Sequence, residues 1–373
     1  MATAVTTPPA GTAQPSHPLD PPEAQEQSIH HSANAKVPWP PAVWEAVHSA
    51  VHDEVMRVEL AHRFMRVHSV HPKTTSVPPD LIFPQALPGD PSTSLTLTVD
   101  EGVTIRLNEI WTEFALTPQQ VHDTAEAKHP HHTTAVSLAR RAAQYLGLAK
   151  NMVILQGANA YSTQYFTQYI RWRQGQIPQD MGLLGAGPGT PFSAPSNPPP
   201  GVPGPGGQTI PIDPLSETEF AGTTASFGVT YGQNTFGGTT EAVSFLTDLG
   251  HPGDFAFILE TYPYADLFAP VGAGSLVVTA DRVTPLVKAG LFSTGALPPN
   301  FLLSTPPPSS PPGGPYYGVL VDPVGDNMDV VVGLHATTVF MQQDPNDNWR
   351  FRVLARFALR LKDPTAVVVL QFN

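Results

Sequence analysis

The sequence predicts an α+β fold, because helical and strand segments follow one another without the regular order of βαβ units. Two observations carry this prediction. Residues 349–373 contain two strands, and amphipathic helical periodicity recurs over 41–66 and 133–156. Two strong strands at the end of the sequence need a sheet to receive them, so earlier segments of the chain must supply that sheet.

The first closing strand alternates without interruption from residue 350 to 361. Successive side chains of a strand point to opposite faces, so one face is apolar and the other is rich in arginine. The arginine-bearing positions are Arg350, Arg352, Leu354, Arg356, Ala358 and Arg360. This row predicts carboxylates or a partner chain opposite it. Asp363-Pro364 ends the strand, and 365–370 is expected to form a second, buried strand.

The helices are predicted from apolar spacing and from start and stop signals. Pro40-Pro41 favours a helix start, and apolar residues recur at helical spacing up to Val58, which predicts a helix over 41–66. These residues are Trp44, Val47, Val51, Val55 and Val58. The second helix is expected over 133–156, with Gly157 as its stop.

The remaining elements are shorter. Alternating apolar residues over 95–99 and 103–107, on either side of Asp100-Glu101-Gly102, predict a hairpin that projects over 94–109 after a proline-rich connection at 72–93. Thr117-Pro118 is a helix-start signal, and 344–348 is expected to be a turn. Further helices are predicted near 238–249, 262 and 280–289, and further strands at 255–260, 317–321 and 328–332.

Length and composition restrict the class of protein. The 373 residues favour about two domains. Only 13% of residues are charged, which is consistent with a surface that other subunits cover. The net charge of -12 argues against general nucleic-acid binding, and the absence of cysteine excludes disulfides and thiolate chemistry. No secretory signal and no run of 18 apolar residues is present, so we expect a cytoplasmic protein without membrane contact.

The search for chemistry finds no catalytic constellation, and we expect no enzyme activity, cofactor or metal. His129, His131 and His132 form the densest histidine cluster, and a histidine-based metal-binding protein is the alternative from another class. His48 and His52 are four residues apart on the first helix, without the HExxH pattern of a zinc protease. Glycine-rich 185–189 lacks the lysine and hydroxyl of a phosphate loop.

Several short segments resemble a known family in their order. They are Trp44-Glu45-Ala46-Val47, the helix 139–157 ending Val153-Ile154-Leu155-Gln156-Gly157, Gly182-Leu183-Leu184, 254–259, 326–333, Phe351-Arg352-Val353-Leu354, Leu359-Arg360 and Pro364-Thr365-Ala366. Together they resemble the encapsulin shell proteins, bacterial nanocompartment subunits with the Hong Kong 97 phage capsid-like fold. The chain departs from that family at Lys150-Asn151, where a Glu-Asp pair is usual.

The resemblance implies a division of the chain. Residues 1–36 would be a disordered or extended N-terminal arm, 37–70 the N-terminal amphipathic helix, and 71–115 the extended hairpin called the E-loop. The P-domain, with the spine helix and the closing strands, would combine 116–165 and 335–373. The A-domain would be 166–334, including a Pro/Gly-rich insertion at 185–235. A second proline run, 304–315, is also extra.

The resemblance also implies a function. The chain would assemble with itself into an icosahedral shell, in sixty copies or a multiple of sixty, which encloses a cargo enzyme carrying a terminal targeting peptide. The cargo peptide would dock on exposed apolar positions of the first helix, such as Val43, Trp44, Val47 and Val51, and on part of the closing strands. Arg350, Arg352 and Arg356 are candidates for ion pairs between subunits. A phage or prophage major capsid protein is the alternative within the same fold.

Overall fold

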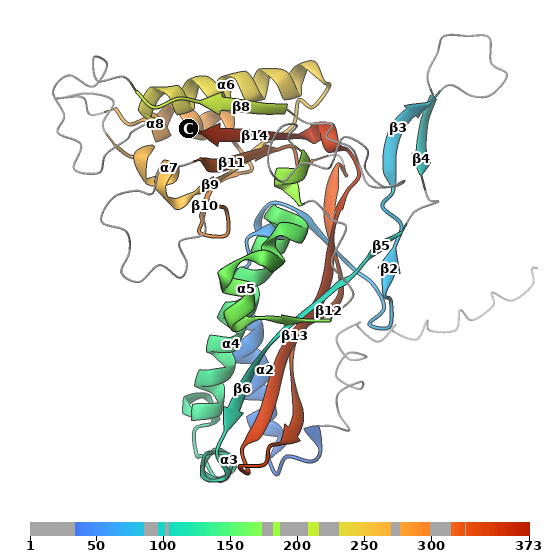
Figure 1. The fold of residues 1–373 in the computed structure, drawn as a ribbon, viewed down its shortest axis with the longest axis vertical. Helices are drawn as coiled ribbons and strands as arrows, with labels where there is room; N and C mark the ends of the chain where they lie inside the picture. Colours follow the sequence, from blue (N-terminus) through green and yellow to red (C-terminus); the bar gives the residue numbers. More distant parts are fainter. Residues whose placement is uncertain are drawn as a thin grey trace, which may run out of the picture.

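The structure is a computed structural model that describes residues 34–85, 96–100, 104–173, 182–186, 208–215, 231–269, 277–298, 315–324 and 326–373. The predictions for 1–33, most of the insertion 185–235 and the proline run 304–314 lie outside these residues. Figure 1 shows two sheets at opposite ends of an elongated subunit, with a ribbon of two strands projecting at one side. In the described part of the chain no helix is both long and apolar enough to cross a membrane.

The first sheet contains the long closing strand at its centre. Its strand order is β1-β12-β13-β6-β7, where β13 spans Trp349–Leu361 and pairs with β12 on one side and β6 on the other, antiparallel to both. The other strands are β1 (Arg66–Ser69), β6 (Asn108–Leu116), β7 (Arg171–Trp172) and β12 (Met328–Gln343). The prediction of an alternating strand over 350–361 is confirmed, and the turn at 344–348 connects it to β12.

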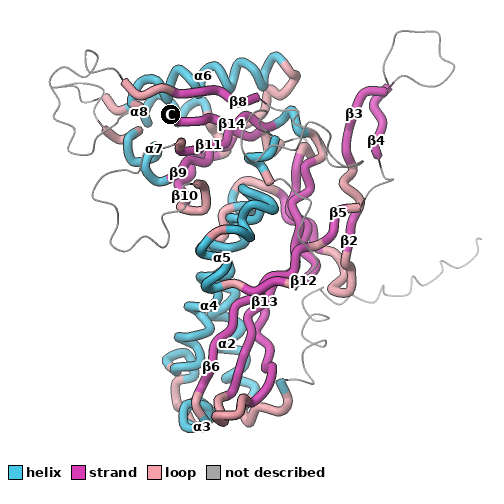
Figure 2. Tube along the Cα trace, in the orientation of Figure 1, coloured by secondary structure: helices cyan, strands magenta, loops and turns pink. Residues whose placement is uncertain are grey.

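Helices cover one face of this sheet, as Figure 2 shows for α2, α4 and α5. The α4 helix (Thr134–Gln156) begins at its N-cap Thr133 and ends at Gly157, whose φ of 58° lies in the left-handed region that favours glycine. Thr117 caps α3 (Pro118–Ala125) with a reciprocal capping box. Both predicted helix starts are confirmed. The short α5 helix spans Gln164–Tyr169.

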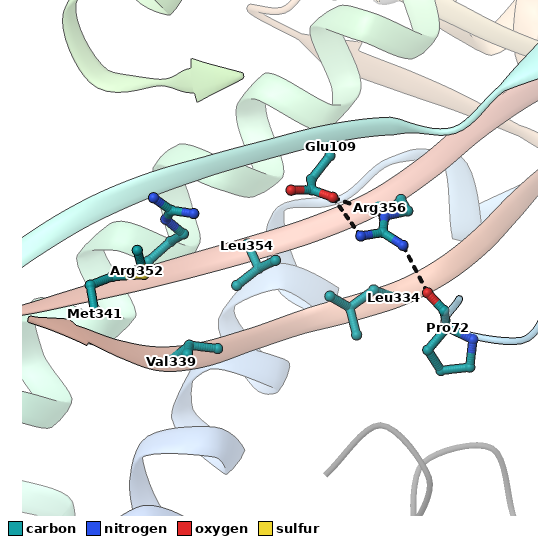
Figure 3. Close-up of a pocket in the computed structure, with 8 residues that line it drawn as sticks. All are labelled: Pro72, Glu109, Leu334, Val339, Met341, Arg352, Leu354 and Arg356. Carbon is teal, nitrogen blue, oxygen red and sulfur yellow. Dashed lines mark hydrogen bonds and ion pairs between the residues drawn. The ribbon is translucent and has the colours of Figure 1, made fainter. Parts of the chain in front are cut away.

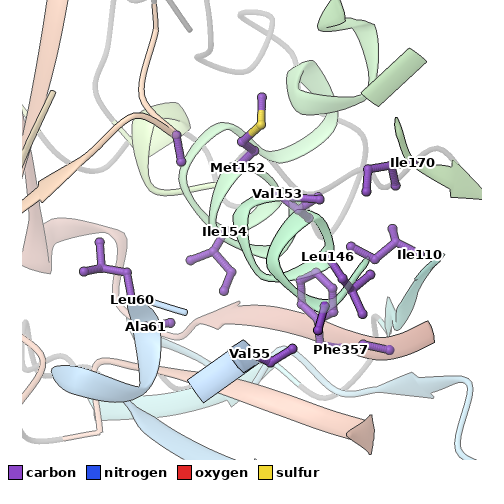
Figure 4. Packing of buried hydrophobic residues seen from close by; sticks show 14 of the residues in the cluster. Val55, Leu60, Ala61, Ile110, Leu146, Met152, Val153, Ile154, Ile170 and Phe357 are labelled. Carbon is purple, nitrogen blue, oxygen red and sulfur yellow. The ribbon is translucent and has the colours of Figure 1, made fainter. Parts of the chain in front are cut away.

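The packing between helices and sheet forms the main core. Figure 4 shows Val55 of α2, Leu146 of α4 and Phe357 of β13 in contact range around the spine helix. The α2 helix spans Pro41–Val58 and is shorter than the predicted 41–66. It ends because the following residues turn through a 3-10 helix (Ala61–Arg63) into β1, which pairs in parallel with the edge of β12. The spacing of apolar residues along the sequence gives no information about this pairing of β1 with β12.

The projecting ribbon corrects the predicted hairpin. β4 (Thr96–Asp100) pairs with β3 (Leu81–Gln85), and β5 (Ile105–Arg106) pairs with β2 (Ser76–Val77). The predicted hairpin partners therefore do not pair with each other: each pairs with an earlier strand, β4 with Leu81–Gln85 and β5 with Ser76–Val77. The prediction was wrong because Asp100-Glu101-Gly102 looks like a turn and the segment before residue 94 looks like a connection.

The second sheet receives the other closing strand. Its order is β10-β9-β11-β14-β8, with β14 (Val367–Phe372) between β11 (Tyr316–Val321) and β8 (Gln208–Ile212). The remaining strands are β9 (Ala256–Glu260) and β10 (Gly290–Thr294). The assignment of both closing strands to one domain was therefore wrong: β13 belongs to the first sheet and β14 to the second. Likewise β6 and the first part of β12 lie in the first sheet, outside the predicted P-domain ranges.

The second sheet is buried on both faces. One face packs on α6 (Gly232–Asp248) and α8 (Thr279–Val283), through residues such as Phe257 and Leu370. The opposite face, with Ile258 and Val369, joins the main core. This double burial explains why β14 reads as a continuous apolar run instead of an alternating one. The α7 helix spans Thr261–Asp266, and further 3-10 turns lie at Pro130–His132, Gly157–Ser162, Leu183–Ala186, Thr284–Leu286 and Pro364–Ala366.

Candidate assembly interface

The arginine row of β13 lies on the sheet face that the helices do not cover. Each of three arginines is directly opposite a carboxylate on a neighbouring strand: Arg352 opposite Glu113, Arg356 opposite Glu109, and Arg360 opposite Asp329. Oppositely charged pairs at facing positions of antiparallel strands stabilise the pairing and its register. The predicted carboxylates opposite the arginine row are therefore supplied by the same chain, from β6 and β12.

The two middle arginines differ in how well they are paired. Both Nε and Nη2 of Arg356 donate to Glu109 Oε2, at 3.0 and 2.5 Å, and Nη1 donates to the carbonyl oxygen of Pro72 at 2.8 Å. Arg352 lies farther from Glu113, at 3.5 Å, and stacks over the Trp111 ring at 4.2 Å from its centroid. Among the described residues, the buried Nε of Arg352 has no hydrogen-bond partner. Arg352 is therefore less fully hydrogen-bonded than Arg356.

The third arginine fixes the base of the projecting ribbon. Nε and Nη2 of Arg360 form a bidentate pair with Asp329, at 2.9 and 2.6 Å, and Nη1 contacts the carboxylate of Asp80 immediately before β3. Asp80 holds a positive φ of 52°, and the following Ile82 donates its N–H to the carbonyl of Lys362 at 3.0 Å. Arg360 is only 8% exposed. We refer to Asp80, Asp329 and Arg360 as the ribbon clamp.

The clamp shifts the titration of its central carboxylate. Burial by itself would raise the pKa of Asp329, but hydrogen bonds from Arg360 and from Lys362, whose Nζ lies 3.1 Å away, outweigh it and lower that pKa. Asp329 is thus ionised at neutral pH. The clamp holds the ribbon through a buried, geometrically specific contact of the kind that fixes orientation.

A pocket of about 280 Å³ lies on this same face of the first sheet, between the ribbon clamp and the turn that connects β12 to β13. Figure 3 shows its two arginines and Glu109 on one side and apolar side chains on the other. Its lining comprises Pro72, Glu109, Leu334, Val339, Met341, Arg352, Leu354 and Arg356. The pocket combines a paired cationic edge with a small apolar floor, which is the composition of a protein contact surface more than of a catalytic cleft.

The last predicted arginine lies at the end of the row. Arg350 is half-exposed, and its Nε lies 3.4 Å from Asp344 in the turn between β12 and β13. Arg350, Arg352 and Arg356 each have a partner within the chain, so the structure places them together on one face without showing a contact between subunits. Their role in such contacts stays a prediction.

The predicted docking residues of the first helix occupy two environments. Val43, Val47 and Val51 are buried at 1%, 0% and 0% exposure in the main core, so the expectation that they are exposed is wrong. The apolar face of α2 packs on the subunit's own spine helix and sheet. Trp44 is half-buried, and the centroid of its ring lies 4.9 Å from that of Trp39 and 6.3 Å from that of Phe351. Of the four, Trp44 alone retains a surface that a partner could contact.

The departure from the family at 150–151 forms a buried contact. Lys150 Nζ pairs with Glu59 at 2.7 Å, with the two side chains 8% and 4% exposed. The neighbouring Asn151 accepts the N–H of Leu60 at 2.8 Å and donates to the carbonyl of Val58 at 2.9 Å. Together these side chains fasten the end of α2 to the spine helix α4. Their role in this chain is structural.

The histidine clusters do not converge. His129 and His132 have ring centroids 6.5 Å apart at a surface 3-10 turn, and His131 is exposed beside them. Across the described ranges, no group of three or more His, Cys, Asp and Glu side chains is arranged to hold a metal ion. His48 makes an edge-on ring contact with Trp44 on α2.

Sequence reasoning missed the acidic partners of the arginine row. The signal was present: over 108–116, Glu109, Trp111 and Glu113 share one parity, while Asn108, Ile110 and Thr112 share the other. The two glutamates are four residues apart, as are Arg352 and Arg356, which is the spacing that antiparallel neighbours need. Asp80 carried no such signal, because it precedes a strand that was expected to be a connection.

Comparison with solved structures identifies the architecture. The virus-like particle protein from Pyrococcus furiosus aligns with 88% of this chain and 98% of its own, at 14% sequence identity and a TM-score of 0.52. The chain has the Hong Kong 97 capsid fold. We use E-loop as a name for the ribbon β2–β5, P-domain for the first sheet with α4, and A-domain for the second sheet. The predicted fold class is confirmed.

Other capsids give lower similarity. The capsid of an empty GTA particle aligns with 84% of this chain and 96% of its own, at 12% identity and a TM-score of 0.48. The Mycobacterium phage Ogopogo structure covers 84% of this chain and 92% of its own, at 11% identity and a TM-score of 0.47. No model of a protein family matches the sequence, and no curated protein matches it.

Proposed function

We propose that this chain is a structural, non-enzymatic shell protein that assembles with copies of itself into a closed icosahedral particle. The observation that carries the proposal is the E-loop: β3 and β4 pair with each other away from the body, while the ribbon clamp fixes their base. A two-stranded ribbon is at best marginally stable in water by itself, so a clamped and projecting one needs a surface to cover it. In a capsid fold, a neighbouring copy supplies that surface.

We further propose that the particle is an encapsulin-like compartment that encloses a cargo enzyme, which makes the protein cytoplasmic. The support is the half-buried Trp44, which packs on the buried Trp39 and leaves part of its own ring for a peptide, together with the order of family-like segments. Val43, Val47 and Val51 would support this patch from the core instead of touching the peptide. A neighbouring gene for a cargo enzyme, with no portal or terminase nearby, would favour a compartment over a phage capsid.

Negative-stain electron microscopy of the chain expressed alone tests assembly. We expect uniform closed particles, because each subunit presents an E-loop and a complementary sheet face. A matched sample with Asp80→Asn and Arg360→Leu should give no closed particles, since the ribbon is no longer fixed. A small soluble oligomer from the unmodified chain, stable over a range of salt and protein concentration, would contradict self-assembly.

A charge exchange between β13 and β6 tests contacts between subunits. Arg352 has a longer ion pair than Arg356, and part of its side chain is exposed, so we choose it for this test. Arg352→Glu should abolish closed particles and also lower the free energy of unfolding, because it places two carboxylates opposite each other and removes the contact with the Trp111 ring. Adding Glu113→Arg restores the pair within the subunit but not a contact with a neighbour.

The outcome of this exchange separates the two roles. We expect the double variant to fold like the unmodified chain and still to assemble poorly, as judged by sedimentation of particles against subunits. Glu109 and Arg356 provide the matched control, since that pair is closer and more buried. Full recovery of particles in the Arg352→Glu/Glu113→Arg variant would show that Arg352 acts only within its own subunit.

A further inference from the structure

Two crossings of the chain between the sheets lie side by side and are joined by backbone hydrogen bonds. The first crossing leads from β11 to β12 and is described at 322–324 and 326–327, and the second leads from β13 to β14 over 362–366. Asp322 N–H donates to the carbonyl of Ala366 at 3.0 Å, and the carbonyl of Asn327 accepts the N–H groups of Lys362 and Asp363 at 2.9 and 3.0 Å. Any rotation of the A-domain relative to the P-domain must change the backbone conformation of these two segments.

A buried histidine sits between the two crossings. His251 follows α6 in the A-domain and is 7% exposed. Its Nδ1 lies 3.6 Å from Asp322 Oδ2 on the first crossing, and its Nε2 lies 3.6 Å from Asp363 Oδ2 on the second. The loop is shaped for this approach, because a Cβ on Gly253 would clash with the Asp322 carboxylate. Three segments that are distant in sequence thus meet at one imidazole.

The hydrogen-bond network fixes the tautomer of His251. Thr365 Oγ1 lies 2.6 Å from Asp363 Oδ1 and donates its single proton to that carboxylate. Its lone pair must then accept from His251 Nε2, 3.0 Å away, so the neutral imidazole carries its proton on Nε2. Nδ1 is left bare, and its lone pair faces the Asp322 carboxylate. That arrangement is unfavourable unless one additional proton lies between Nδ1 and Asp322.

The surrounding charges favour that proton. Asp322 is 3% exposed, and burial raises its pKa, while the positive form of His251 opposes the rise. Asp254 and Asp363 add further negative charge near Asp322. The nearest cation on the second crossing, Lys362, is already paired with Asp329. The other nearby cation, Lys288, lies 3.6 Å from Asp254 Oδ1 and is exposed, so neither lysine is paired with Asp322 itself.

We propose that His251 is a proton-operated latch between the two domains. With one proton between Nδ1 and Asp322, the imidazole joins the A-domain loop to both crossings and holds the domains in one orientation. Loss of that proton as the pH rises leaves a lone pair against a carboxylate, and the crossings loosen. Burial raises the pKa of Asp322, so the folded chain binds this proton more strongly than the unfolded chain does, and the stabilisation is present at low pH and is lost as the pH rises through that raised pKa. The latch holds whether or not subunits assemble.

Thermal unfolding of the full chain between about pH 5.5 and pH 8.5 tests the latch. His251→Gln keeps a side-chain donor for Thr365 but cannot take up the proton. We expect the midpoint of the unmodified chain to fall by about 2–4 °C more over this range than that of His251→Gln. His122→Gln is the matched control, since His122 is exposed and pairs only with Glu126 on its own helix, and its profile should follow the unmodified chain.

A local readout separates the latch from a purely structural role. Hydrogen exchange over 322–327 and 362–366, corrected for intrinsic rates, should accelerate several-fold with rising pH in the unmodified chain and not in His251→Gln. If His251→Gln fails to fold, Asp322→Asn keeps the shape of the carboxylate and should lose the same pH dependence. Equal pH profiles for the unmodified chain and both variants, by midpoint and by exchange, would overturn the proposal.

Discussion

Lys150→Met is expected to lower the free energy of unfolding by about 3–5 kcal/mol, the largest effect of any single substitution that we expect on the helical layer. Lys150 and Glu59 form an ion pair at 2.7 Å and are almost wholly buried, and Lys150 Nζ also lies 5.2 Å from the centre of the Phe357 ring. Removing the lysine leaves the Glu59 carboxylate in the core without its counter-charge. The loss should appear as a lower denaturant midpoint at unchanged slope.

The double variant Lys150→Met/Glu59→Gln is the control for this prediction. Replacing both charges removes the uncompensated carboxylate, so most of the stability should return, as it does when buried pairs are exchanged for uncharged groups of similar size. Asn151 continues to bind the backbone at Val58 and Leu60 in both variants. If Lys150→Met alone leaves the midpoint unchanged, the pair does not fasten α2 to the spine helix.

Arg360→Leu is expected to cost a similar amount and also to prevent closed particles. The substitution removes both bonds to Asp329 and the contact with Asp80, so it strips a buried carboxylate and frees the base of the E-loop. We expect a loss of about 3–5 kcal/mol in the free energy of unfolding. Arg360→Lys keeps the charge but cannot reach both carboxylates with a fork, so it should recover part of the stability and little of the assembly.

The pH dependence of this variant has a defined sign. The pKa of Asp329 is lowered in the folded chain, so its contribution is present above the ordinary aspartate range and is lost as the pH falls toward the folded value. Arg360→Leu should therefore flatten the acid side of the stability profile, measured by denaturant midpoints below about pH 5. A steep acid limb that survives the substitution would place the acid sensitivity elsewhere. This loss of stability occurs as the pH falls, whereas the loss expected from His251 occurs as the pH rises.

Sequence reasoning succeeded where the signal is local. The alternation of β13 and the capping of α3 and α4 by Thr117, Thr133 and Gly157 are written in adjacent residues, and the structure confirms each. It failed where the partner is distant. β3 contains Pro84 and lies in a segment that looks like a connection, so its pairing with β4 could not be read from either strand. The early end of α2 depends on β1 finding the edge of β12.

The same division applies to the candidate interface. The arginine face was found because its residues share one parity. Its partners are distant in the sequence: Glu109 and Glu113 lie more than 200 positions before their arginines, and Asp329 lies 31 positions before Arg360. Arg360 was recognised as part of the row and not as the residue that fixes the E-loop, since Asp80 gives no sign of its position. The burial of Val43 and Val47 could not be distinguished from exposure, because both faces of a helix show the same period.

The central places of β13 and β14 have a consequence for the order in which the subunit matures. β13 lies between β12 and β6 in the first sheet, and β14 lies between β11 and β8 in the second. Neither sheet can close until residues 349–372 are available to pair, so folding of both sheets must wait for the same late-synthesised segment. The two sheets are therefore expected to be completed together, and a chain cut before residue 349 should lack the central strand of the first sheet and an inner strand of the second.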